Sequence, residues 1–132
     1  MINRVRCGVV LAACWSVLAC SDPAAPDPLG SWGGEGASVV VTASLTEFEF
    51  DCAHGQVEGV LALDGQGSFS AEGVYVREGG PVPSEGHEAV PARYQGTVAG
   101  DRMTLFVLLE GSEPIGPRQL RRGEEPLLRK CL

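Results

Sequence analysis

The sequence predicts an all-β protein, and within that class a small eight-stranded antiparallel up-and-down barrel. No segment after the N-terminal apolar run shows sustained helical periodicity, short apolar alternations recur along the chain, and turn residues separate them at close intervals. The 18 glycines and nine prolines provide these turns. Short strands joined by hairpins also build β-sandwiches, so a sandwich is the alternative fold.

The N-terminal segment has the composition of a secretory signal peptide. Arg4 and Arg6 precede an apolar run over 7–19, and small residues end that run. The run is shorter than the roughly 20 residues that cross a hydrocarbon core as a helix. We therefore expect a signal-peptide helix over 1–19 that is removed on export.

The end of this segment, VLAC over 17–20, resembles the lipobox of bacterial lipoproteins. The resemblance implies cleavage before Cys20, a diacylglyceryl group on its sulfur, and a further acyl chain such as palmitate on the freed amine. Cys14, at the end of LAAC, is the alternative lipidation site, although it leaves an apolar core of only about seven residues. Ser21 after the cysteine implies an outer-membrane address in the bacterial cell envelope. A plain secreted protein with unmodified Cys20 is the remaining alternative.

A short tether follows the signal, and the folded domain follows the tether. SDPAAPDPL over 21–29 holds three prolines and two aspartates, a composition that cannot build a core and favours extended, disordered chain. We divide the chain into a signal peptide over 1–19, a lipidated tether over 20–29 and a barrel domain over 30–132.

The charge balance narrows the class of partner. The full chain has 10 basic and 17 acidic residues; removing 1–19 leaves eight basic against 17 acidic, a net charge of −9. Nucleic-acid affinity depends on Lys and Arg that neutralise phosphates, so we expect no nucleic-acid partner. The negative net charge of the mature chain also opposes docking on anionic lipid. We therefore expect the N-terminal lipid to hold the protein at the membrane, and we expect the protein to be a monomer.

The mature domain contains apolar alternations of strand length. We predict strands over 38–42, 45–52, 56–63, 67–77, 91–99, 102–110, 117–122 and 126–131. Phe48, Phe50 and Cys52 fall on one face of the second of these strands, with acidic residues on the other. The strand over 102–110 is apolar on both faces and is expected to be the most covered.

The connections favour hairpins between successive strands. DGQG over 64–67 and AGD over 99–101 place glycine where tight β-turns need a positive φ. A long proline- and glycine-rich loop is expected over 79–91. These short connections support a meander that can close on itself.

Cysteine usage predicts one disulfide. Three of the five cysteines lie in the signal or at the lipidation site, which leaves Cys52 and Cys131 as a pair in an exported protein. Closing a loop of about 80 residues contributes on the order of 4 kcal/mol in the chain-entropy account.

Gly30-Ser31-Trp32 resembles the G-x-W pattern that opens the first strand of lipocalins and related calycin barrels. The resemblance implies that Trp32 plugs one end of the barrel beneath a basic side chain from the last strands. The candidates for that side chain are Arg118, Arg121, Arg122 and Arg129. The WGG start, the central FDCAHG and the terminal KC also resemble small uncharacterised bacterial lipoproteins, a likeness that carries no activity.

FDCAHG crowds an acid, a thiol and an imidazole into six residues and therefore invites a catalytic or metal-site interpretation. Asp51 and His54 point to opposite faces of a strand, and a zinc site needs three or four ligands. The interpretation we favour is a strand end carrying the disulfide. With no nucleophile-elbow, metalloprotease or P-loop motif present, we expect no enzyme, no cofactor and no metal.

Two functions fit these features. One is a lipid-anchored interaction or structural module that meets an envelope protein; the alternative is a lipocalin-like carrier of a small apolar ligand. An eight-stranded barrel either encloses a small ligand or is filled by its own side chains, and we favour a filled interior. The candidate ligand, rim or plug residues are Trp32, Phe48, Phe50, Tyr75, Tyr94 and Arg129.

Overall fold

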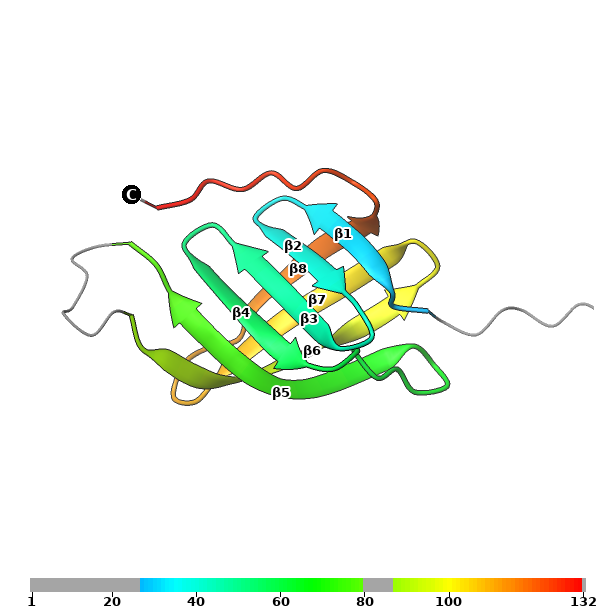
Figure 1. The fold of residues 1–132 in the computed structure, drawn as a ribbon, viewed down its shortest axis with the longest axis horizontal. Helices are drawn as coiled ribbons and strands as arrows, with labels where there is room; N and C mark the ends of the chain where they lie inside the picture. Colours follow the sequence, from blue (N-terminus) through cyan, green and yellow to red (C-terminus); the bar gives the residue numbers. More distant parts are fainter. Residues whose placement is uncertain (1–26, 80–86, 132) are drawn as a thin grey trace, which may run out of the picture.

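The structure, a computed structural model, describes residues 27–79 and 87–131. Its strands are β1 (Gly30–Gly34), β2 (Ala37–Val41), β3 (Leu45–Phe50), β4 (Ala53–Glu58), β5 (Ser68–Arg77), β6 (Ala89–Ala99), β7 (Arg102–Leu109) and β8 (Ile115–Arg122). Each pairs antiparallel with its neighbour in the chain, and β8 returns to β1 to close the barrel (Figure 1). The eight-stranded, calycin-like barrel is confirmed, and the sandwich is excluded.

Six of the predicted strands coincide with observed ones to within about two residues at each end. The strand predicted over 56–63 begins three residues earlier, because Asp51 and Cys52 form a tight turn that pairs Phe50 directly with Ala53. It also ends earlier, at Glu58, where Gly59 has a positive φ of 86° and its N–H donates to the Ser44 carbonyl at 2.9 Å.

The first and last strands of the barrel differ from the predicted ones. The prediction of a strand over 126–131 is wrong. Because β8 already pairs with β1, the tail finds no free strand edge there, and its described residues form one parallel bridge, from Leu127 to Glu35. The missing member is β1, whose sequence GSWGG has no apolar alternation to indicate a strand. The closing pair is therefore β1 and β8, in place of the strands predicted over 38–42 and 126–131.

The meander gives the barrel two distinct ends. β1 begins and β8 ends at one rim of the barrel, beside the β6–β7 turn at Gly100 and Asp101. We call this rim the tether end, because the chain enters the barrel there at Asp27. The opposite rim carries the β3–β4 turn with Cys52, and we call it the disulfide end. After β8 the tail returns along β1 and β2 to the disulfide end (Figure 1).

Inward-facing side chains fill the barrel. Alternate residues of β2, β3, β4 and β7 are buried, and the pattern is most regular in β7. The core comprises Trp32, Ala37, Val39, Val41, Phe48, Phe50, Ala53, Val57, Leu61, Phe69, Tyr75, Ala92, Tyr94, Val98, Met103, Leu105, Val107, Leu109 and Leu120. The prediction that β7 is covered on both faces is confirmed, since its outward residues from Thr104 to Leu108 are half-buried.

Several predictions fall on residues outside the described part of the chain. These are the signal-peptide helix over 1–19, both candidate lipidation sites (Cys14 and Cys20), the tether up to residue 26, and residues 80–86 of the long loop. Within residues 27–79 and 87–131, no helix has the length and apolar character to cross a membrane.

Candidate functional site

Two aromatic rings occupy the middle of the barrel. Phe48 of β3 and Tyr94 of β6 stack with centroids 3.9 Å apart and planes 8° from parallel, and both are at most 1% exposed. The Tyr94 hydroxyl donates to the Val74 carbonyl at 2.6 Å, which satisfies the one polar group of this pair. Burial, followed by the neighbouring Tyr75, raises the pKa of Tyr94, so the phenol stays neutral.

A glycine makes room for the Tyr94 ring. A Cβ at Gly55 of β4 would collide with the Tyr94 hydroxyl and with the Val74 carbonyl. The Tyr94 hydroxyl therefore fills the space that a side chain at position 55 would otherwise occupy. The aromatic residues we considered as ligand contacts fill the interior themselves.

Phe50 and Tyr75 lie closer to the disulfide end. Their ring centroids are 5.8 Å apart at an angle of 43°, and both side chains are buried. Burial raises the pKa of Tyr75, against the opposing charges of Arg77 and Arg118. These two rings close the interior from the disulfide end.

Trp32 closes the tether end. Its indole is 1% exposed, and its Nε1–H donates to the Pro28 carbonyl at 2.9 Å. The Arg122 guanidinium lies over the ring, 4.3 Å from its centroid, because the two residues are direct partners in the β1–β8 ladder. This cross-strand register selects Arg122 from the four candidate arginines.

Arg122 also holds the chain that enters the barrel. Its Nη1 donates to the Leu29 carbonyl at 2.7 Å, and its Nη2 donates to the carbonyls of Asp27 at 2.7 Å and Gly100 at 3.3 Å. Its Nε pairs with Asp101 at 3.3 Å. One side chain thus joins the plug, the entering chain and the β6–β7 turn.

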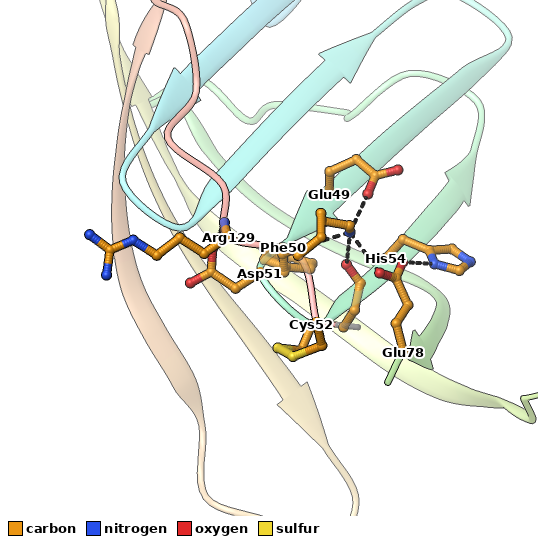
Figure 2. Close-up of polar contacts among 10 residues, drawn as sticks. Glu49, Phe50, Asp51, Cys52, His54, Glu78 and Arg129 are labelled. Carbon is orange, nitrogen blue, oxygen red and sulfur yellow. Dashed lines mark hydrogen bonds and ion pairs between the residues drawn. A yellow bond between two sulfur atoms is a disulfide. The ribbon is translucent and has the colours of Figure 1, made fainter. Parts of the chain in front are cut away.

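The other candidate arginines lie elsewhere. Arg129 lies in the tail at the disulfide end, where its backbone N–H donates to Asp51 at 2.8 Å and its side chain points away (Figure 2). Arg118 faces inward near the disulfide end, with a buried Nε that has no hydrogen-bond partner among the described residues. Arg121 is exposed on the outer face of β8.

FDCAHG forms the hairpin corner at which the tail is fastened. Cys52 in the turn bonds to Cys131 across a Cα–Cα separation of 5.0 Å, so the predicted disulfide is confirmed. The Asp51 carbonyl accepts the Cys131 N–H at 3.2 Å. The Cys52 carbonyl accepts the Glu78 N–H at 2.8 Å, which joins the end of β5 to the same corner.

Lys130 completes the corner through several acceptors. Its ammonium binds the carboxylates of Glu49 at 2.9 Å and Glu78 at 2.8 Å, and it donates to the carbonyls of Phe50 at 2.9 Å and Ala53 at 3.4 Å (Figure 2). Partial burial works against its charge, but the hydrogen bonds of Glu78 and Glu49 outweigh it and raise the pKa of Lys130.

Glu78 links this ammonium to the imidazole of FDCAHG. Its second oxygen lies 2.5 Å from His54 Nδ1. The hydrogen bond from Lys130 is the largest influence on Glu78 and holds the pKa of that carboxyl below its ordinary value, with His54 assisting. His54 is therefore hydrogen bonded to the same carboxylate that binds Lys130 and so belongs to the network that anchors the tail.

The reactive groups of the FDCAHG corner serve to attach the C-terminal tail to the barrel. The Cys52 sulfur is consumed by the disulfide, and no three His, Cys, Asp or Glu side chains among the described residues gather around one point as metal ligands do. Glu49 and Asp51, two of the acidic residues opposite Phe48 and Phe50 in the strand predicted over 45–52, bind the tail.

Sequence reasoning did not assign the roles of Glu78 and Lys130. A signal was present, since Lys130 is the only lysine in the sequence and lies beside Cys131. Glu78 had no such mark, because its partners His54 and Lys130 are both distant from it in the sequence. Lys130 and Arg122 each pair with carboxylates from other elements of the barrel.

An apolar stripe crosses the outer face of β5, β6 and β7. Val74 and Pro91 are cross-strand partners, Val74 is 37% exposed, and Leu108 lies on the adjoining strand. The three residues line one open hollow of about 470 Å³, bordered by the ion pair of Glu72 and Arg93. We call Val74, Pro91 and Leu108 the apolar stripe.

Comparison of the chain with protein-family models, with curated proteins and with solved structures finds no match.

Proposed function

We propose that the protein is a lipid-anchored, non-enzymatic module of the bacterial envelope that presents the outer face of its barrel to a partner protein. The observation that carries the proposal is the filled interior: Trp32, Phe48 and Tyr94 occupy the space in which a carrier would hold its ligand. A barrel of this size has room for a ligand only where its side chains leave it. Binding is therefore assigned to the outside.

The apolar stripe is the proposed contact surface. Exposed apolar side chains that adjoin one another and are bordered by charges are typical of protein contact sites. Val74 and Pro91 adjoin in the ladder, and the Glu72–Arg93 ion pair borders them. The stripe lies on the strands β5, β6 and β7, so a partner binds without ordering a loop first.

Photo-crosslinking in the native host tests the stripe. A photoreactive amino acid at Val74 or Leu108 is expected to trap one discrete protein, whereas the same group at Val40 is not. Val40 is the matched control, because it is a valine of similar exposure on the outer face of β2. Equal trapping from all three positions, or none from any, contradicts the proposal.

The anchor is proposed at Cys20, with Cys14 as the alternative, and it places the protein at the outer membrane. The support is the lipobox resemblance of VLAC and the entry of the tether at one end of the barrel. Cys20→Ser is expected to release the mature protein from the membrane and to abolish the acyl mass on its N-terminal peptide. A Cys20→Ser protein that stays in the membrane with acylated Cys14 would contradict the assignment.

A carrier of a small apolar ligand is the second candidate function. It is supported by a hollow of about 610 Å³ at the disulfide-end rim, which Val90, Pro91 and Leu109 line beside Arg77. Native mass spectrometry of the protein purified from its own envelope decides between the two. A co-purified small-molecule mass favours the carrier, and a clean protein mass favours the module.

A further inference from the structure

Two arginines face each other on the outer surface near the tether end. Arg102 of β7 and Arg121 of β8 are direct cross-strand partners, and both are exposed. Side chains in such a position have Cβ atoms about 5 Å apart, and like charges placed there destabilise the sheet. Neither arginine forms an ion pair with any described residue, although the chain carries a net charge of −7.

The carboxylates nearby do not neutralise the pair. Asp101, next to Arg102, pairs with the Arg122 guanidinium instead. Glu124 contacts Arg121 through its backbone, its N–H donating to the Arg121 carbonyl at 3.3 Å. The next partners along the ladder, Thr104 and Gln119, are uncharged and hydrogen bond to each other at 3.0 Å. A local positive site therefore remains in an acidic protein.

The pair lies at the end of the barrel from which the tether leaves. A single nitrogen of Arg122 binds the carbonyls of both Asp27 and Gly100, so the entering chain adjoins the turn that precedes Arg102. Asp27 lies seven positions after Cys20 in the sequence, a span of at most about 25 Å. An acyl chain on Cys20 would therefore keep this end close to the lipid headgroups.

We propose that Arg102 and Arg121 form a phosphate clamp that docks the tether end of the barrel onto anionic phospholipid headgroups. The proposal rests on the lipid anchor of the proposed function and adds the orientation of the anchored barrel. Two adjacent guanidinium groups match the oxygens of one phosphate, which also removes their mutual repulsion. Charges farther from the bilayer than about 8 Å are screened at physiological salt, so the acidic residues at the disulfide end contribute little repulsion there.

Hydrogen exchange of the intact lipidated protein in vesicles tests the clamp. Exchange of the Gly100 and Asp101 amides is expected to be about tenfold slower in vesicles containing phosphatidylglycerol than in phosphatidylcholine alone, and 0.5 M salt should remove the difference. Arg102→Gln with Arg121→Gln should also remove it. The matched control, Arg77→Gln with Arg129→Gln, removes the same charge at the disulfide end and should leave it intact.

The remaining outcomes separate the two proposals. Equal exchange in both kinds of vesicle, with the acyl mass present on Cys20, overturns the clamp and leaves the anchor standing. Inorganic phosphate that slows exchange equally in phosphatidylcholine vesicles overturns the lipid assignment. Absence of the acyl mass overturns the anchor. In that case, co-sedimentation of the unacylated chain with phosphatidylglycerol vesicles supports the clamp, and failure of the chain to sediment with them overturns the clamp.

Discussion

Two polar side chains, those of Tyr94 and Arg122, illustrate how single residues hold this barrel together. Each combines contact with an aromatic ring and hydrogen bonds to backbone carbonyls of other elements. The aromatic contact places the side chain, and the hydrogen bonds satisfy its polar end. Replacing only the polar end therefore isolates its contribution.

Tyr94→Phe keeps the stack on Phe48 and removes the hydroxyl. The Val74 carbonyl loses that buried donor, so we expect the free energy of unfolding to fall by about 1–2 kcal/mol in urea denaturation. Because the pKa of Tyr94 is raised by burial, its neutral form contributes stability below its unfolded pKa of about 10, and that contribution is lost as pH rises above it. An unchanged stability, or a cost that does not shrink in alkaline solution, contradicts this account.

Arg122→Lys keeps the positive charge near Trp32 but loses the planar fork that reaches Asp27 and Leu29. We expect a loss of about 1–3 kcal/mol and faster proteolysis at the entering chain. Arg129→Lys is the control, because the Arg129 side chain is exposed and points away from the corner. Equal behaviour of the two variants would show that the fork contributes nothing.

The C-terminal tail is held to the barrel by a few hydrogen bonds, ion pairs and the disulfide instead of by pairing as a strand of the sheet. It crosses β1 at Gly33, where a Cβ would collide with the Glu124 carbonyl, so glycine is required for its path. Leu127 exchanges backbone hydrogen bonds with the β1–β2 turn, at 3.0 Å to Gly34 and to Gly36. Lys130 and Cys131 then fasten it to the FDCAHG corner.

The ion pairs of this attachment depend on pH. The lowered pKa of Glu78 means that its contribution is present above the unfolded value near 4.5 and is lost as pH falls below it. The raised pKa of Lys130 means that its contribution is present below 10.5 and is lost at higher pH. The tail is therefore held by charge between these limits.

Glu78→Gln is expected to lower stability by about 1 kcal/mol at neutral pH and to have no effect near pH 3. Glu47→Gln, which removes the same charge from an exposed position on β3, should be neutral at both. Urea denaturation of both variants at the two pH values measures the difference. A constant cost for Glu78→Gln across pH would assign its role to packing instead of charge.

At the scale of the whole molecule, one disulfide joins a central hairpin to the end of the chain. Cys52 and Cys131 are 79 residues apart, and the loop that they close contains β4 to β8. A cross-link over so long a loop restricts the unfolded chain far more than the folded barrel. Its stabilisation is therefore expected to be a global property.

Cys52→Ser with Cys131→Ser is expected to lower the free energy of unfolding by about 4 kcal/mol in urea. Reduction of the wild-type protein should lower it by a similar amount, since both treatments remove the same cross-link. The barrel itself should persist in the absence of denaturant, as judged by its far-ultraviolet circular dichroism. A loss below 1 kcal/mol for both would indicate that the unfolded chain gains little freedom.

The all-β class, most strand positions and the cysteine pair follow from the amino-acid sequence. Side-chain alternation in β3 and β7 and the turn glycines are local properties, readable from neighbouring residues. The pairing of β1 with β8, the path of the tail outside the barrel and the position of Arg122 over Trp32 are visible only in the folded molecule. These outcomes depend on which strand edges are already paired and on the cross-strand register, which join residues some 90 positions apart. The sequence placed FDCAHG at a strand end carrying the disulfide, and the structure added the partners of its imidazole and of its acid.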